Sequence, residues 1–189
     1  MKPKEIAGRM LGAIGEAAAA DILWVLCSLP VFTAGASAAA LYYCTVESVR
    51  KGEGNVLTDF FRVFRESFWK SLPICMIHAV YYAALAYAAI KIKNTPGYTP
   101  GGIYTGVLIG FVILGSWLLP YVFAVIARKD CSGAEAVRYA FYLSVKKIYF
   151  TLPLIILLWL CAAACVSRSA LLLFVPAAYE LAVSFVLEP

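Results

Sequence analysis

Long apolar runs separated by short polar stretches make up most of the chain from Ala13 onward. A helix that spans a membrane needs about 20 mostly apolar residues, within a usual range of about 17–25. Runs that meet or approach this length lie at residues 71–90, 103–126, 150–166 and 171–187. We therefore predict a spanning helix over each of these ranges.

The first apolar run, from Ala13 to Val49, is too long for one span and contains Pro30 and Gly35 near its middle. Proline removes a backbone donor and clashes with the preceding helical turn, and glycine is typical of turns. We therefore predict two spans, over 13–29 and 34–49, joined by a tight turn. A single crossing by the whole run is the alternative.

The basic residues favour the two-span interpretation of this run. With a hairpin and a cytoplasmic N-terminus, most of the 16 lysines and arginines lie on the cytoplasmic side, and Lys91, Lys93 and Arg168 lie outside. A single crossing would move the basic residues of the N-terminus outside as well. Because cytoplasmic loops carry an excess of lysine and arginine, we predict six spans with both termini in the cytoplasm.

Two polar connectors on the cytoplasmic side have helical periodicity. Apolar residues recur every three or four positions over 55–70 and again over 132–149, which is the spacing of an amphipathic helix. Ser132 and Glu135 also have the spacing of a capping box. We predict two interface helices that lie along the membrane or pack on the bundle. The alternative is that each connector extends the next spanning helix.

Proline and glycine positions refine the predicted spans. Pro73 and Pro153 lie near the starts of two spans, where proline suits the first helical turn. Gly106 and Gly110 form a GxxxG pattern in the span over 103–126. This pattern favours close helix packing within the chain or, as the sharper alternative, in a homo-oligomer.

Composition agrees with a membrane protein. Of the 189 residues, 63% are apolar and 14% are charged, whereas soluble domains are about 45–50% apolar and about 25% charged. The formal net charge of +5 comes from bases beside apolar runs, as at Arg50-Lys51 and Arg128-Lys129. This placement favours lipid headgroups over nucleic acid. The sequence thus predicts an all-α, polytopic transmembrane bundle that forms one domain over 1–189.

Candidate chemistry is sparse. The six cysteines lie mostly in apolar runs without CxxC spacing, so we expect reduced thiols and no metal site. No catalytic or cofactor motif is present, and we expect neither an enzyme nor a bound cofactor.

Three ionisable residues lie within predicted spans, and such residues are functional suspects because burying them in lipid is costly. They are Asp21, His78 and Glu180. At about 1.5 Å of rise per residue, all three lie at a depth of roughly 10–12 Å from the cytoplasmic side. They either share a polar pocket for a proton, a cation or a sugar hydroxyl, or are unrelated residues satisfied by nearby backbone.

One part of the chain resembles the YesL-like family of bacterial membrane proteins, a domain of unknown function numbered 624. The resemblance covers about residues 20–73 and rests on the segments 24–35, 39–43, 50–54 and 59–62. Asp21 stands where the resemblance implies a neutral asparagine. The family implies a bacterial cytoplasmic membrane and an association with carbohydrate uptake and glycan breakdown, and it supplies no catalytic residues.

Two functional hypotheses follow. The first is a non-enzymatic accessory or regulatory component of a carbohydrate-uptake system, whose cytoplasmic helices bind a transporter subunit. The alternative is a small solute transporter or channel that uses Asp21, His78 and Glu180.

Overall fold

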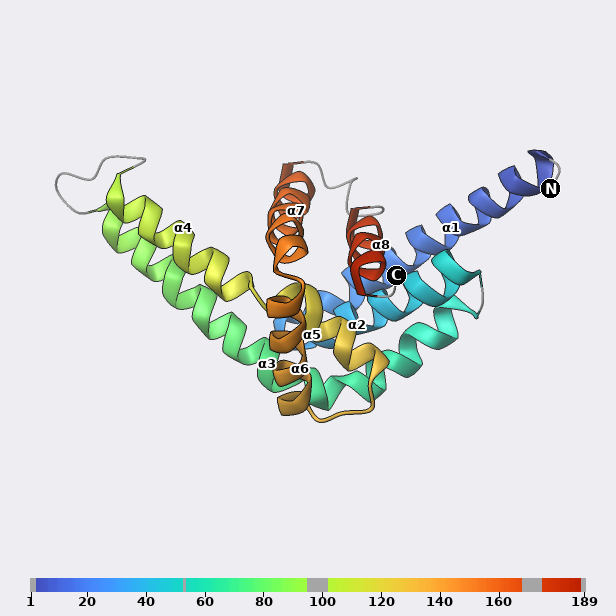
Figure 1. Ribbon diagram of the computed structural model, residues 1–189, viewed down its shortest axis with the longest axis horizontal. Helices are drawn as coiled ribbons and strands as arrows, with labels where there is room; N and C mark the ends of the chain where they lie inside the picture. The colour runs from blue at the N-terminus through green and yellow to red at the C-terminus, as the bar shows by residue number, and fades with distance from the viewer. Residues whose placement is uncertain (1–2, 53, 95–101, 168–174, 188–189) are drawn as a thin grey trace.

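The computed structural model describes residues 3–52, 54–94, 102–167 and 175–187. This part of the chain is all-α, which confirms the predicted fold class. Its elements are α1 (Pro3–Ser28), η1 (Val31–Thr33), α2 (Ala34–Cys44), η2 (Thr45–Lys51), α3 (Val56–Lys93), α4 (Ile103–Ser116), α5 (Leu119–Arg128), α6 (Gly133–Lys146), α7 (Ile148–Ser167) and α8 (Val175–Leu187). The helices form a wide V, in which α1, α2 and the first half of α3 make one arm (Figure 1). The second half of α3 and α4 make the other arm, and α7 and α8 stand between the two.

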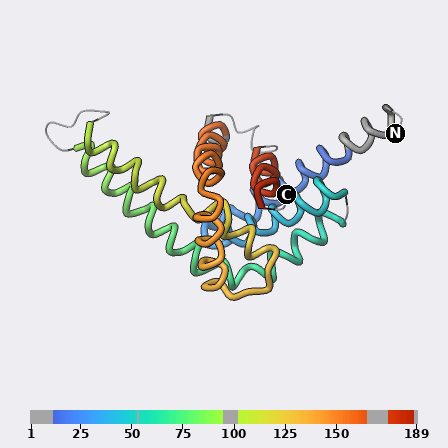
Figure 2. The backbone as a smooth tube through the Cα atoms, in the orientation of Figure 1, coloured from blue at the N-terminus to red at the C-terminus, as the bar shows by residue number. Residues whose placement is uncertain are grey.

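The first apolar run is divided at the predicted turn. Helix α1 ends at Ser28, a short 3-10 turn follows Pro30, and α2 begins at Ala34. The hydroxyl of Thr33 lies within hydrogen-bonding distance of the carbonyl oxygens of Cys27 and Pro30, at 2.5 and 2.7 Å. By donating to the carbonyl oxygen of Cys27, it can satisfy a group that the end of α1 leaves without a helical partner. The predicted helix–turn–helix arrangement is confirmed, and the tube in Figure 2 shows the reversal of the chain.

Helix α2 is the centre of the structure. Nearly all of its residues are buried, and many are small: Gly35, Ala36, Ser37, Ala39 and Ala40. It packs against α1, α3, α5 and α8. Small side chains let helix backbones approach closely, which is the usual basis of helix packing in membranes.

Helix α3 corrects the prediction of a separate interface helix over 55–70. One continuous helix runs from Val56 to Lys93, and Pro73 lies in its interior instead of opening a span. Asn55 caps its start by accepting a hydrogen bond from the backbone N–H of Leu57 at 3.0 Å. Since no glycine interrupts these residues, the helix continues through the proline, and Figure 1 shows α3 changing direction between the two arms.

The other predicted interface helix is confirmed as a separate element. Helix α6 begins with the predicted capping box, in which the side chains and backbone N–H groups of Ser132 and Glu135 bond reciprocally. It ends at Lys146, and α7 leaves it at an angle of 108°. Pro153 again lies inside the helix, six positions into α7, and not in its first turn.

The predicted span over 103–126 is interrupted. Helix α4 ends at Ser116 and α5 begins at Leu119, with Pro120 in its first turn. Proline disfavours a helical conformation in the preceding residue and cannot donate to the carbonyl four residues earlier. Pro120 therefore accounts for a break that the apolar pattern did not reveal.

The GxxxG prediction is wrong for packing within the chain. A side chain added at Gly106 or Gly110 would meet no atom within 4 Å. The close contact on this helix occurs at Gly115, which packs against the ring of Tyr81. The Gly106 face of α4 is therefore open in the single chain.

The outer surface is that of a membrane protein. Large apolar side chains on α3 and α4 are exposed, among them Ile77 (68%), Val80 (66%) and Leu114 (65%), and water-soluble monomers rarely expose contiguous apolar patches of such extent. In the part of the chain that the structure describes, Val56–Lys93 and Ile103–Arg128 are long and apolar enough to cross a bilayer. Helices α6 and α7 make a third candidate if the bent pair is one span.

The remaining crossings of the six-span prediction are not shown. Residues 171–174, the first of the predicted sixth span, lie outside the described residues, as does Arg168. The number of spans beyond the two or three candidates therefore stays a prediction.

The close packing of α2 makes Gly35 sensitive to substitution. A Cβ atom at Gly35 would lie 2.8 Å from Phe123 and 3.0 Å from Ser71. Overpacking of this kind costs roughly 1–3 kcal/mol. We expect Gly35→Val to lower the thermal unfolding temperature in mild detergent, followed by circular dichroism. Gly106→Val is the matched control, because it adds the same side chain to a helix in open space. Equal unfolding temperatures for the two variants would contradict the central position of α2.

Candidate functional site

A pair of acidic residues lies between the first and last helices. Asp21 on α1 is fully buried, and its carboxylate faces the backbone amide of Ala177 on α8. Neither carboxylate oxygen forms a hydrogen bond of normal geometry. Glu180, three residues beyond Ala177, lies close enough to Asp21 for direct electrostatic repulsion. The structure therefore brings together two of the three predicted site residues.

Small residues allow this approach of α1 and α8. Four alanines, residues 17–20, precede Asp21, and Ala20 is fully buried. Ala177 is 1% exposed on the facing helix. Short side chains on both helices let the backbones come close, so that the two carboxyl groups come within range of electrostatic repulsion.

The acidic pair borders an apolar cavity of about 260 Å³. Residues of α1, α2, α5, α7 and α8 line it, and most of them are aliphatic or aromatic, such as Trp24, Leu41, Phe123, Leu158 and Tyr179. Glu180 is the charged residue of this lining. The adjacent Tyr179 is 7% exposed, and its buried hydroxyl has no hydrogen-bond partner. The cavity therefore has apolar walls and one strongly polar end.

His78 lies apart from the acidic pair. Its Nδ1 atom is 2.9 Å from the carbonyl oxygen of Ile74, one helical turn earlier, and its ring centroid is 6.4 Å from that of Tyr82. No hydrogen bond or salt bridge among the described residues connects it to Asp21 or Glu180. The structure thus places Asp21 near Glu180 and His78 apart from both, and a polar pocket shared by these residues stays a prediction.

His78 instead borders a hydrogen-bonded cluster at the base of the α3–α4 arm. Ser116 is fully buried, and its hydroxyl oxygen accepts a bond from the indole N–H of Trp159 at 2.9 Å. The hydroxyl of Tyr82 lies 2.9 Å from the same oxygen. These bonds join α3, α4 and α7. Sequence reasoning missed the cluster because the partners are far apart along the chain.

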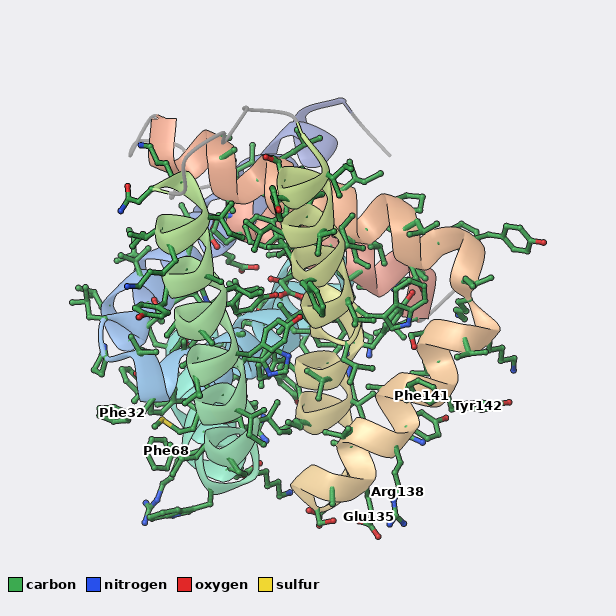
Figure 3. The ribbon with its side chains drawn as sticks, turned by 90° about the vertical axis from the view of Figure 1, so that its left-hand side faces the viewer. Phe32, Phe68, Glu135, Arg138, Phe141 and Tyr142 are labelled. Atoms are coloured by element: carbon green, nitrogen blue, oxygen red, sulfur yellow. The ribbon has the colours of Figure 1, made fainter. Side chains whose placement is uncertain are left out.

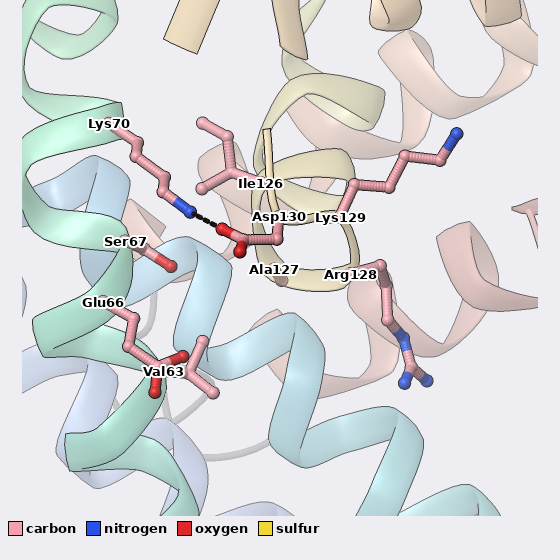
Figure 4. Close-up of a pocket in the computed structure, with 9 residues that line it drawn as sticks. All are labelled: Val63, Glu66, Ser67, Lys70, Ile126, Ala127, Arg128, Lys129 and Asp130. Atoms are coloured by element: carbon pink, nitrogen blue, oxygen red, sulfur yellow. Dashed lines mark hydrogen bonds and ion pairs between the residues drawn. The ribbon is translucent and has the colours of Figure 1, made fainter. Parts of the chain in front are cut away.

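A second, polar groove lies where α3 meets the end of α5 (Figure 4). Its volume is about 500 Å³, and its charged lining residues are Glu66, Lys70, Arg128, Lys129 and Asp130. The ammonium group of Lys70 donates to Asp130 at 2.8 Å, which lowers the pKa of that exposed carboxyl group. Arg128 also pairs with Glu47. The paired basic residues of the sequence pattern therefore form salt bridges between helices as well as facing the surface.

The carboxylate pair and the cavity beside it offer a place for a ligand. Among the described residues, no group of three histidine, cysteine or acidic side chains is placed to hold a metal ion. The cysteines described at 27, 44, 75, 131 and 161 form no disulfide bond with one another, while the side chain of Cys165 lies outside the described residues. A buried carboxylate pair beside an apolar cavity can hold a proton or a positively charged ligand.

Comparison with known proteins supports the family resemblance and adds no specific role. No curated protein and no solved structure matches the chain. A family model described as "Protein of unknown function, DUF624" matches residues 17–88. These residues cover α1 from Ala17, α2 and most of α3, so they include Asp21 and the central helix. Residues 17–88 thus form a DUF624 domain, which confirms the resemblance seen over residues 20–73.

Proposed function

We propose that this protein is a non-enzymatic accessory or regulatory component of a carbohydrate-uptake system in the bacterial cell membrane. It crosses the membrane six times with both termini in the cytoplasm. The observation that carries the proposal is the outward face of α6, on which Phe141 and Tyr142 are exposed and which lies beside the polar groove. The family resemblance supplies the link to carbohydrate uptake.

Helix α6 has one face for the bundle and one for a partner. Ala136, Ala140 and Ser144 are buried against the neighbouring helices. Phe141 and Tyr142 are 58% and 56% exposed, and Figure 3 shows them projecting from the helix beside Arg138. Aromatic residues and arginine are the side chains that dominate the energy of protein interfaces. These side chains also suit the headgroup layer of a membrane. They would keep α6 at the cytoplasmic surface of the membrane, where a partner protein can contact it.

The polar groove gives this side of the molecule charges of both signs. Lys70, Arg128 and Lys129 lie in it together with Glu66 and Asp130. Mixed charges suit recognition of a protein surface, because complementary pairs set orientation and exclude wrong partners. The groove and the α6 face therefore support a protein partner on the cytoplasmic side.

A small solute transporter or channel is the second candidate function. The approach of Asp21 and Glu180 inside the helix bundle favours it, since acidic residues within spans commonly mark ion or proton pathways. His78 does not share their pocket, so it has no place in this version of the mechanism.

The six-span topology predicts where reporter domains will be found. Fusions of a fluorescent protein after residues 52, 130 and 189 should fluoresce, because these positions are cytoplasmic. Fusions after residues 97 and 170 should instead activate alkaline phosphatase, which folds only outside the cytoplasm. Antibody access to an N-terminal epitope in intact spheroplasts would show that the first apolar run crosses once, because a single crossing moves the N-terminus outside.

The accessory role predicts a stable partner. The full chain, purified from its own membrane in mild detergent, should bring a transporter subunit with it, identified by mass spectrometry. Phe141→Ser should release this subunit. Phe61→Ser is the matched control, since Phe61 on α3 has a similar exposure of 54% and lies on another face. Recovery of the chain alone would contradict the accessory role, and equal retention by both variants would exclude the α6 face as the interface.

The transport alternative predicts that substitutions of the two acidic residues change solute flux and that substitution of His78 does not. In liposomes containing the purified protein, Asp21→Asn and Glu180→Gln should each change solute flux, because they remove the paired charges. His78→Ala should leave flux unchanged, since His78 bonds to its own helix. Flux that ignores both carboxylate substitutions would remove the basis of this candidate.

A further inference from the structure

We propose that the cavity beside Glu180 binds a small lipophilic organic cation, such as a substituted ammonium group with an apolar body. The cavity lies between α1, α2, α5, α7 and α8 and combines apolar walls, aromatic rings and a carboxylate. This site goes beyond the accessory role. The proposal concerns only binding of the cation, and it applies whether the protein transports the cation, senses it or only holds it.

The charge of the ligand follows from the acidic pair. Asp21 and Glu180 lie within range of mutual repulsion, and no basic side chain of the described part of the chain forms a salt bridge with either. Two acidic groups that are withdrawn from water and lack a counterion can carry charge only at a cost in free energy. A cation seated against Glu180 would supply the missing positive charge and balance Asp21 behind it.

The apolar character of the ligand follows from the walls. Leu41, Leu119 and Leu158 contribute aliphatic surface, and Trp24 and Phe123 contribute aromatic surface. Cations bind favourably over aromatic faces, most strongly over tryptophan and where water is excluded. The volume of about 260 Å³ limits the ligand to a small molecule. Small-molecule sites generally have this construction, with mainly apolar walls and a few polar groups that fix orientation.

Tyr179 provides a second polar contact. Its side chain lines the cavity and is 7% exposed, with a hydroxyl group that lacks a partner. Buried polar groups are nearly always hydrogen-bonded. An acceptor atom of the ligand, or a water molecule bound to the ligand, would supply the hydrogen bond that this hydroxyl group lacks. Together with Glu180, it places both polar contacts on α8.

Two other ligand classes fit less well. A sugar presents many hydroxyl groups, and each one left unpaired against apolar walls would cost roughly 1–3 kcal/mol. A metal ion needs several ligands, and the described residues contain no cluster of three histidine, cysteine or acidic groups. An organic cation requires only the charge and the aromatic surface that the cavity provides.

Isothermal titration calorimetry of the full-length protein in non-ionic detergent tests the proposal. The probe is benzyltrimethylammonium, and its control is neopentylbenzene, which has the same shape with carbon in place of the charged nitrogen. We expect the cation to bind more tightly than the neutral molecule. Glu180→Gln should weaken cation binding roughly 10- to 100-fold, as expected for loss of a contact to a charged group. Glu66→Gln, which removes a carboxylate from the polar groove, should leave it unchanged.

Trp24→Leu is a second variant that keeps the cavity apolar. It should weaken cation binding roughly 2- to 5-fold, the usual effect of one cation–aromatic contact, and leave binding of neopentylbenzene unaffected. Thermal unfolding of each variant confirms that the protein is folded. Equal binding of the two probes would overturn the proposal, because it would identify a cavity that any apolar molecule fills. Unchanged cation binding in folded Glu180→Gln would overturn it as well. Neither result would affect the partner or flux experiments.

Discussion

The burial of α2 is the constraint on which the other helices depend. A helix at the centre of a bundle must let neighbours approach on every side, and the small residues from Gly35 to Ala40 allow this. Helices α1, α3, α5 and α8 then pack against it from different directions. Gly35 marks the closest approach, where Phe123 and Ser71 leave no space for a Cβ atom. The DUF624 domain over residues 17–88 contains this whole helix.

The acidic pair is a consequence of that packing. Because α1 and α8 contact both α2 and each other, a residue in the last third of α1 lies near the middle of α8. Asp21 and Glu180 occupy those positions, with alanines around them. Carboxylates without a counterion lower stability, and residues that do so in a buried place are generally retained for function. The contact that holds the helices together therefore also creates the most unusual chemical environment of the described chain.

The V shape separates two regions with different roles. The second half of α3 and α4 form an arm with exposed Ile77 and Leu114, which lipid can cover. Bonds between Ser116, Tyr82 and Trp159 attach the base of this arm to α7. Helix α6 turns away from α7 by 108°, and its Phe141 and Tyr142 project outward (Figure 3). The lipid-facing surface and the surface proposed for a partner thus belong to different helices.

Local features of the sequence were sufficient to predict several elements. The turn after Pro30, the capping box at Ser132 and the all-α, apolar character of the chain depend on a few neighbouring residues or on composition. Such features act through the backbone close to where they occur, so they can be interpreted without knowing the fold. The sequence did not predict that α3 continues through Pro73 or that a break precedes Pro120. One proline bends a helix and another ends it, depending on which residues pack around each.

Only the tertiary structure decided which distant residues meet. The sequence predicts equal membrane depths for Asp21, His78 and Glu180, so it does not tell which of them are neighbours. In the structure, Glu180 lies near Asp21, and His78 lies near Tyr82. The choice depends on how each helix is rotated and which neighbour it contacts, and periodicity within one helix does not contain that information. The same holds for the cavity, whose walls come from five helices. Sequence determined the helices of this protein, and packing determined its site.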